Sequence, residues 1–419
     1  MNRTILIAVI LAAIAVPLAA DEVSSPSFFI ERIEVRNATR VSPDVVISES
    51  ALRAGREYSE AELRDGANRL SRLPFLLSAD FSLERGTERG RHVLVITISE
   101  TKPFFFLLDG RVILGESYIG SPNDDSLANG QEAVLGFRWF VGRRGAIHVG
   151  LFGADDDRDY TASYSAFGVG YTRYDLFGTR AFVTLNLKKP FGNANGGGEL
   201  SPQIVAGIPL SINQTLTLDY DETRFDTRER EYFELGTVEE GFTQRILSAR
   251  WSYNTTNRPF VPTSGTIVSV TPVAVWADRK GVIYERGADD RIRPSRLTSD
   301  AKSLGIDASA KRYWELSERD SVSAGVAGGW ATTDERRNIG DISYDSTFAV
   351  IHAGYSHSLW DRARQKDGDS RFEFDVRAAR RSRERSVFLE RNNDVLQISG
   401  AWVRRSSYGT LRIGLGYAW

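Results

Sequence analysis

The sequence predicts a mainly β protein in which a sixteen-stranded antiparallel transmembrane β-barrel follows a small α+β domain. Three observations lead to this expectation. An export signal opens the chain, helical and strand periods alternate in the region that follows, and strand-length alternating segments fill the long remainder up to Trp419.

The first twenty residues have the form of a secretory signal. Arg3 gives a positive start, and residues 5–18 are apolar. The small residues Ala19 and Ala20 then offer a cleavage site, so we expect residues 1–20 to be a removed signal peptide. The alternative is an uncleaved anchor, for which the apolar stretch is short, because a membrane-spanning helix needs about 20 apolar residues.

Composition argues against several functional classes. The 53 Lys and Arg residues balance 55 Asp and Glu, so a net charge of -2 gives no reason to expect a nucleic acid partner. The absence of Cys excludes thiolate metal sites, and four His leave little for a histidine site. No Ser lies in a nucleophile context such as G-x-S-x-G. We therefore predict no enzyme, no catalytic residues, no cofactor and no bound metal.

Residues 27–102 are expected to form one domain of the order strand, helix, helix, strand, strand. Ser42 and Pro43 open the first helix as N-cap and first helical residue. Ser59, with Glu62 three residues later, has the spacing of a capping box and opens the second. Alternating apolar residues predict strands at 28–35, 75–83 and 92–99.

This order, closing in VLVITISETKP with Glu100, resembles a polypeptide-transport-associated (POTRA) domain. The resemblance implies a periplasmic module that binds extended client segments by adding a strand to an edge of its sheet. Main-chain hydrogen bonds would then carry the affinity. An unrelated small α+β domain would have the same order, and it stays open as the alternative.

Residues 103–419 are expected to form the barrel. In the last segment, Leu411 and Ile413 fall on one face of a strand, while Arg412 and Gly414 fall on the other. A soluble β-sandwich also alternates in this way, so periodicity alone does not decide between the two. Strands are expected at 104–114, 131–141, 145–153, 160–172, 179–189, 198–208, 213–225, 242–256, 265–277, 301–314, 320–332, 346–358, 371–381, 385–391, 394–404 and 408–419.

The connections predict an orientation for this barrel. The charged segments 226–240 and 278–300 are expected to be external loops, and tight turns such as 142–144 and 316–319 to be periplasmic. The short strand at 385–391 gives the even number of strands that is usual in single-chain bacterial barrels.

Two turns and the carboxyl terminus resemble one family. The segment NRPFVPTSG before the ninth strand is similar to a turn of the outer-membrane protein assembly and translocation family that includes BamA and TamA, the bacterial surface antigen type. YDLFGT at 174–179 resembles a second turn of that family, and the ending LRIGLGYAW is typical of outer-membrane barrels. The turn motif comprises Arg258, Pro259, Phe260, Pro262 and Gly265.

One family motif, Val-Arg-Gly-Phe/Tyr, is absent from the expected loop 333–345. In the family its arginine meets an acidic lumen residue, for which Asp375 is the counterpart implied here. Either Arg336 or Arg337 replaces that arginine, or both are solvated charges, and the two interpretations stay open. The residues expected to line the lumen are Arg138, Asp307, Glu373, Asp375, Arg377 and Arg412.

The resemblance implies insertion or translocation of client proteins at the outer membrane of a Gram-negative-type bacterium, with the amino-terminal domain in the periplasm. Clients would be templated at a weak lateral seam between the first and last strands, with position 106 opposite position 415. The expected seam residues are Phe104, Phe106, Leu108, Leu411, Ile413, Gly414, Gly416 and Trp419.

Expected partners are unfolded client proteins, outer-membrane lipid, and lipopolysaccharide at the arginine-rich segment 377–385. Periplasmic accessory proteins are a further partner class left open. The alternative function is a passive diffusion pore or transporter of the outer membrane, in which the lumen charges would set ion preference.

Overall fold

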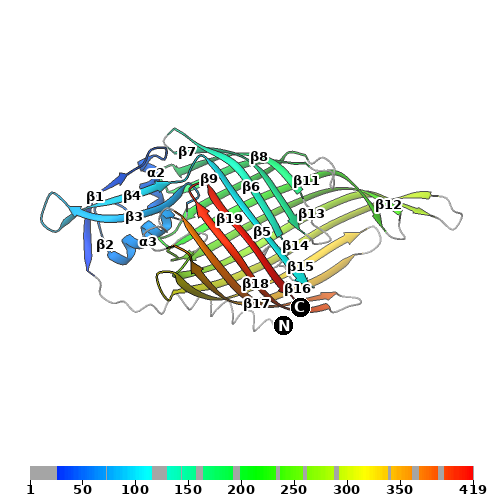
Figure 1. Cartoon of the computed structure of the whole chain (residues 1–419). Coiled ribbons are helices and arrows are strands. Elements are labelled where there is room, and N and C mark those ends of the chain that lie inside the picture. Colours follow the sequence, from blue (N-terminus) through cyan, green and yellow to red (C-terminus); the bar gives the residue numbers. More distant parts are fainter. Residues whose placement is uncertain are drawn as a thin grey trace.

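The computed structural model describes a closed β-barrel with a small α+β domain at one end (Figure 1). Among the described residues, neither helix is long and apolar enough to cross a membrane. The described residues are 26–71, 73–115, 130–142, 144–156, 164–191, 199–232, 236–257, 262–286, 292–337, 341–360, 368–385 and 391–418.

The α+β domain, called here the amino-terminal domain, has a four-stranded sheet of order β2-β1-β4-β3. The sequence predicted both helices and three of the strands, but it missed β2, which is only four residues long and pairs antiparallel with β1. The elements are β1 (Ser27–Arg36), α2 (Pro43–Ser50), β2 (Arg56–Ser59), α3 (Glu60–Ser71), β3 (Leu76–Arg85) and β4 (Arg91–Glu100).

Local capping explains where these helices begin. The Ser42 side chain accepts a hydrogen bond from the Asp44 backbone N–H at 3.3 Å, ahead of α2. At α3, the Ser59 N–H donates to Glu62 Oε2 at 2.8 Å, and the Glu62 N–H donates back to Ser59 Oγ at 3.2 Å. This reciprocal pair is the predicted capping box, so both helix starts are confirmed.

In the part of the chain that the structure describes, fifteen strands form the barrel, and each pairs antiparallel with the next. Because their number is odd, the closing pair, β5 with β19, is parallel. The strands are β5 (Phe104–Gly115), β6 (Gly130–Val141), β7 (Gly145–Asp156), β8 (Tyr164–Leu176), β9 (Ala181–Phe191), β10 (Ser201–Pro209), β11 (Gln214–Tyr232), β12 (Gly236–Asn254), β13 (Gly265–Arg286), β14 (Ile292–Glu315), β15 (Asp320–Arg337), β16 (Ile342–Ser358), β17 (Asp369–Arg385), β18 (Arg391–Ser406) and β19 (Gly409–Ala418).

The predicted strand at 385–391 is not a separate strand among the described residues. β17 continues to Arg385, β18 begins at Arg391, and Arg383 pairs with Arg391 across the hairpin. Residues 386–390 lie outside the described residues. Within the residues that the structure describes, the barrel therefore has fifteen strands where sixteen were expected, because the arginine-rich segment extends two long strands.

Two segments predicted as external loops are largely strand. Arg228 of β11 pairs with Glu240 of β12, and Asp278 of β13 pairs with Asp300 of β14. Their main-chain groups are satisfied across the hairpin, and such pairing leaves no signature in the local composition. In these two segments a run of charged residues therefore belongs to paired strands and not to a loop.

The two ends of the barrel differ. The connections that run from an even-numbered to an odd-numbered strand, among them 142–144, 210–213, 316–319 and 407–408, gather at the end that carries the amino-terminal domain (Figure 1). The opposite end is formed by β11 to β17, which are 17 to 24 residues long. The described part of β19 also ends there, because β19 runs parallel to β5.

The faces of the barrel strands follow the predicted alternation. Phe374 of β17 and Leu415 of β19 point outward and are 56% and 61% exposed, whereas Asp375 and Arg412 lie on the inner face with smaller exposure. The outside is thus apolar and the inside is polar along these strands. This is the opposite of a soluble sandwich, in which the apolar face meets a core.

Candidate functional site

The seam between β5 and β19 is paired over ten residues, from Gly409 opposite Phe106 to Ala418 opposite Gly115. Leu411 lies opposite Leu108. The expected proximity of position 106 to position 415 is wrong, because it assumed antiparallel strands. Of the other predicted seam residues, Phe104 precedes the paired stretch and Trp419 lies outside the described residues.

Gly409 is the seam residue that sequence reasoning missed. Its φ is +147°, and a Cβ added there would collide with the backbone carbonyl of Phe106. In addition, the Phe106 N–H donates to the Tyr408 carbonyl at 2.8 Å, and the Lys102 N–H donates to the Ser407 carbonyl at 2.7 Å. The start of β19 therefore closes directly onto the segment that links the amino-terminal domain to β5.

The domain meets the barrel beside this seam, in what we call the seam-side contact. Phe75, only 2% exposed, packs edge-on against Phe140 at 5.2 Å and against Tyr174 at 5.4 Å between ring centroids. Arg405 of β18 donates to the Leu77 carbonyl at 2.9 Å, and Arg138 of β6 donates to the Pro74 carbonyl at 2.9 Å.

A second contact, the turn-side contact, joins α2 and α3 to the barrel turns. Arg69 donates to Thr215 Oγ1 at 3.1 Å, and Asn213 Nδ2 donates to the Asp65 carboxylate at 2.6 Å. Arg180 donates to the carbonyl of Ala51 at 3.1 Å. The two partners of each hydrogen bond are more than 100 positions apart in the chain, so no local motif predicts their pairing.

Glu49 of α2 is the unusual member of the turn-side contact. It is 3% exposed, and its Oε1 has no hydrogen-bond partner among the described residues. Burial raises the pKa of Glu49 to about 7; the charge of Arg69 opposes this shift, and Asp175 adds to it. A carboxylate in this setting titrates near neutral pH.

Asp175 belongs to the predicted family turn 174–179. The Asp175 carboxylate pairs with Arg144 at 2.9 Å and accepts the Arg180 N–H at 3.2 Å. Asp175, Phe177 and Gly178 all have positive φ. The turn thus presents a buried carboxylate to Glu49, while Phe177 is exposed.

The other predicted turn motif is described only in part. Arg258, Pro259 and Phe260 lie outside the described residues. Asn257 organises the remainder, because its Nδ2 donates to Thr263 Oγ1 at 2.7 Å, and its Oδ1 accepts the Thr263 N–H at 3.1 Å. After Pro262, Gly265 has a φ of +103°, and a Cβ there would meet the Thr255 carbonyl oxygen at 2.5 Å.

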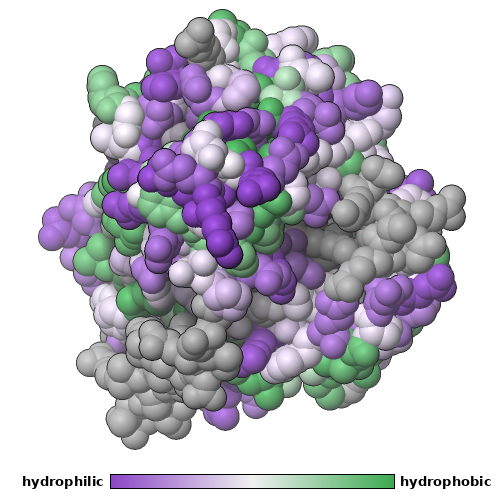
Figure 2. Space-filling model, turned by 90° about the vertical axis from the view of Figure 1, so that its left-hand side faces the viewer, coloured by the Kyte–Doolittle hydropathy of each residue, from purple (hydrophilic) through white to green (hydrophobic). Residues whose placement is uncertain are grey.

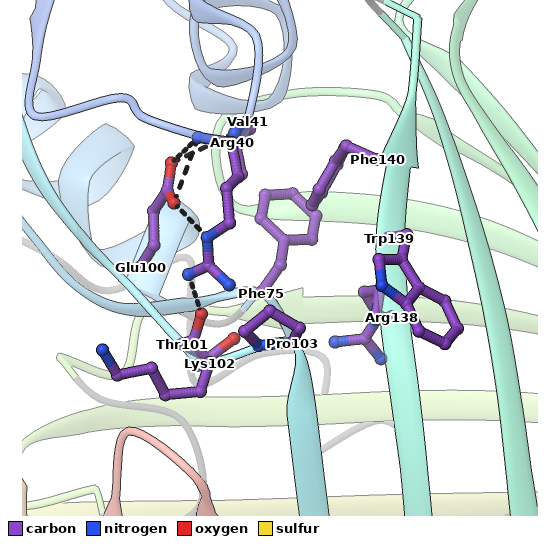
Figure 3. Close-up of a pocket in the computed structure, with 10 residues that line it drawn as sticks. All are labelled: Arg40, Val41, Phe75, Glu100, Thr101, Lys102, Pro103, Arg138, Trp139 and Phe140. Atoms are coloured by element: carbon purple, nitrogen blue, oxygen red, sulfur yellow. Dashed lines mark hydrogen bonds and ion pairs between the residues drawn. The ribbon is translucent and has the colours of Figure 1, made fainter.

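Glu100 closes the amino-terminal domain at the junction with the barrel (Figure 3). Its carboxylate accepts backbone N–H groups of Thr39 at 2.9 Å, Arg40 at 3.0 Å and Val41 at 3.0 Å. Burial alone would raise the pKa of Glu100, but the hydrogen bonds from Arg40, Val41 and Thr39 outweigh it and lower that pKa. The ionised Glu100 carboxylate therefore holds the backbone of residues 39–41 against the end of β4.

The residues predicted to line the lumen lie in three parts of the barrel: on β17 and β19, on β6 and on β14. Glu373 and Arg412 form an ion pair at 3.0 Å that spans the intervening strand β18, and Asp375 pairs with Arg377 within β17. Arg138 lies at the other side of the seam, against the amino-terminal domain. Asp307 of β14 lies next to Gly329 of β15, which leaves room for its side chain.

Arg336 and Arg337 do not replace the missing family arginine at Asp375. Asp375 is level with Gly354 of β16 and hence with Ser323 of β15. Arg336 is thirteen positions farther along β15, which is about 40 Å at the rise of a β-strand. Residues 333–337 belong to that strand and not to a loop folded into the lumen.

Comparison with known proteins gives structural neighbours only. No protein-family model matches the chain, and no curated protein does. The barrel is similar to BamA from Haemophilus ducreyi lacking POTRA domains 1–3, at 12% identity and a TM-score of 0.37, covering 94% of this chain and 85% of that one. CdiB from Acinetobacter baumannii matches at 9% identity and a TM-score of 0.38, covering 93% and 74%.

OmpT, an outer membrane protein of Vibrio cholerae, matches at 11% identity and a TM-score of 0.35, covering 75% of this chain and 94% of that one. These low scores carry no argument about family or function. Membership of the assembly and translocation family stays a prediction from the sequence motifs.

Proposed function

We propose that the chain is an outer-membrane β-barrel whose amino-terminal domain lies in the periplasm. Outward side chains such as Phe137, Leu185 and Phe374 are large, apolar and exposed, as a surface in contact with lipid requires. The amino-terminal export signal and the short turns at the domain end support this orientation.

We further propose that the barrel inserts or translocates client proteins. The observation that carries this proposal is the position of β3. It is an edge strand of the domain sheet, and it begins at the barrel seam, where Leu77 meets Arg405 of β18 and β4 leads through Lys102 into β5. An extended client segment added to the β3 edge would therefore arrive beside β5 and β19.

At the seam, opening the β5–β19 pair would expose N–H and C=O groups that lipid cannot satisfy. An incoming strand can bond to these groups, so the seam would act as a template. The Leu77 carbonyl, held by Arg405 at 2.9 Å, keeps the start of β3 in place during this exchange.

A disulfide across the seam tests this mechanism. The natural chain has no Cys, so the pair Leu108→Cys and Leu411→Cys, which lie opposite each other, introduces the only link. In liposomes, the wild type should accelerate insertion of an unfolded test barrel. The oxidised variant should lose that acceleration and regain it on reduction.

The matched control places the disulfide between two ordinary barrel strands, at Val376→Cys and Ile398→Cys, and it should leave activity intact. Removing residues 21–102 should also abolish acceleration, with heat-modifiable gel mobility reporting whether the barrel still folds. Full activity of the oxidised seam variant would exclude the lateral mechanism.

A diffusion pore or transporter is the second candidate, favoured by a polar ladder on the inner wall. His148 Nε2 lies 2.7 Å from Asn186 Oδ1, and Asn186 Nδ2 donates to Gln203 Oε1 at 2.9 Å. Lys188 pairs with Asp221 at 2.9 Å on the same wall. Steady ion conductance in planar bilayers, without acceleration of client insertion, would establish this function instead.

A further inference from the structure

The outer wall of the barrel carries a cation near the end of β18, on the side of the barrel where the amino-terminal domain lies. Arg404 is exposed and lies opposite Leu411 of β19. Its neighbour Arg405 faces the other way and donates to the Leu77 carbonyl, so Arg404 points outward. Seen from the domain end, hydrophilic residues lie beside hydrophobic ones around the rim of the molecule (Figure 2).

The Arg404 guanidinium lies over an aromatic ring and not beside a carboxylate. Its Cζ is 4.3 Å from the centre of the Trp360 ring. Within the described part of the chain, Arg404 has no carboxylate partner. Contact with a ring face leaves the N–H groups of a guanidinium without an oxygen acceptor, so they can donate to the oxygens of a phosphate. Arg404 therefore has both the charge and the donors that bind an anion.

An apolar surface adjoins Arg404 on the same outer face. Trp402 precedes it by two positions in β18 and lies between Phe372 of β17 and Ile413 of β19, which are 44% and 56% exposed. The Trp402 indole N–H donates to Ser370 Oγ at 3.0 Å, so this ring is held against the wall. Because β18 runs toward the domain end, Trp402 lies farther from that end than Arg404. A cation at the rim of an outward apolar surface matches the headgroup and the acyl chains of a phospholipid.

The same pairing of arginine and tryptophan recurs on β14. Arg312 lies over the ring of Trp314 at 5.6 Å, and both are exposed near the domain end of that strand. On β15, between the two arginines, the Asp320 carboxylate accepts from the Tyr355 hydroxyl at 2.6 Å and lies 2.8 Å from His357 Nδ1. Trp and Tyr side chains gather where a barrel meets the lipid headgroups, so these residues mark that level on the outer wall.

We infer that Arg404 binds the phosphate of an anionic glycerophospholipid of the periplasmic leaflet, whose acyl chains lie over Trp402 and Phe372. The inference rests on the proposed membrane placement. A zwitterionic headgroup would bring its own cation beside Arg404, so an anionic headgroup is favoured. A soluble phosphate would use the cation alone, whereas the adjoining apolar surface fits a lipid. A cation near a membrane surface strengthens binding of an anionic lipid about fivefold.

Quenching of Trp402 fluorescence tests the site in the full mature chain. The protein is placed in phosphatidylcholine vesicles that contain either brominated phosphatidylglycerol or brominated phosphatidylcholine, and the Trp402 signal is the difference from Trp402→Phe. Brominated phosphatidylglycerol should reach half-maximal quenching at about a fivefold lower mole fraction, because Arg404 enriches it beside Trp402.

Variants assign this preference to Arg404. Arg404→Gln should remove it and Arg404→Glu should reverse it, with heat-modifiable mobility reporting a folded barrel. Lys302→Gln is the matched control, because Lys302 is an exposed cation on the same face of β14 as Arg312 but toward the opposite end of the barrel, and it should keep the preference. An unchanged preference in Arg404→Glu would overturn the proposal.

The remaining outcomes separate the site from the membrane placement. Equal quenching by the two lipids in the wild type would overturn the lipid site while leaving the barrel in the membrane. No quenching by either lipid would contradict the membrane placement itself. Soluble glycerol phosphate should leave the preference unchanged, and its loss in that competition would show a site for free phosphate and overturn the lipid assignment.

Discussion

The two contacts between the amino-terminal domain and the barrel differ in their chemistry. The seam-side contact is apolar at its centre, where Phe75 packs against Phe140 and Tyr174. The turn-side contact is polar and includes Glu49, a buried carboxylate that faces Asp175. The centre of the seam-side contact has no group that titrates near neutral pH, whereas the turn-side contact contains one that does.

This difference fits the proposed work of the two sides. A client delivered along β3 needs a fixed start of that strand at the seam, which apolar packing and arginine-to-carbonyl bonds provide. The turn-side contact adds a buried carboxylate, Glu49, so the strength of this contact should vary with pH.

The largest expected effect is at the seam side. Phe75→Ala removes a fully buried aromatic ring shared by the domain and the barrel, and it should lower the local free energy of unfolding by about 3–5 kcal/mol. Amide hydrogen exchange at Lys102, whose N–H bonds to Ser407, measures this change. Phe81→Ala, within the same domain core, should weaken the domain but preserve protection at Lys102.

At the turn side, stability should depend on pH through Glu49. Its pKa lies at about 7 instead of 4.5, so the folded state holds a proton that the unfolded state releases. The contact should be strongest below pH 4.5 and weaken as pH rises to 7 and beyond, by about 3 kcal/mol in all. Amide exchange across α2 between pH 5 and 8 checks the slope.

Glu49→Gln should flatten this pH dependence, because the amide keeps the shape of the protonated acid and cannot titrate. Glu60→Gln, at an exposed position of α3, is the control and should retain the slope. A wild-type contact that is equally stable at pH 5 and pH 8 would remove the distinction between the two contacts.

The sequence allowed prediction of those features that depend on residues close together in the chain. The capping box of Ser59 and Glu62 acts over three residues, and strand alternation acts over two, so both were readable. Glu100 was singled out, but its partners at 39–41 lie about sixty positions away, and only the folded chain brings them together. Arg405 and Leu77, which join the domain to the barrel in the seam-side contact, are 328 positions apart, and no local pattern links them.

The prediction of two long external loops failed for a related reason. Strands β11 to β14 extend through charged segments because each edge pairs with a neighbour, and pairing depends on residues in another strand. Gly409 carried no signal either, since the collision that forbids a side chain there comes from Phe106, some 300 positions earlier. The parallel pairing of β5 with β19 follows from the odd number of strands in the described barrel.

Gly409 provides a test of the seam that does not involve the domain's own core. Gly409→Ala places a Cβ against the Phe106 carbonyl at a positive φ, so the seam should lose about 2 kcal/mol. Thermal unfolding followed by heat-modifiable mobility measures the loss. Gly400→Ala in β18, where a Cβ would meet Phe374 at an ordinary 3.5 Å, should leave the unfolding temperature unchanged.

The smallest effect is expected for one hydrogen bond of the turn-side contact. Arg180→Gln removes the donor to the Ala51 carbonyl, which caps α2, and should weaken the contact by about 1 kcal/mol at every pH. Amide exchange across α2 at pH 5 and 8 measures the stability of the contact in Arg180→Gln and in Glu49→Gln. Arg173→Gln, at an exposed position of β8, is the control. We expect Arg180→Gln to lower the stability of the turn-side contact equally at pH 5 and pH 8. We expect Glu49→Gln to raise that stability at pH 8 relative to the wild type. Together these results would assign the titration to the Glu49 carboxylate and not to the surrounding arginines.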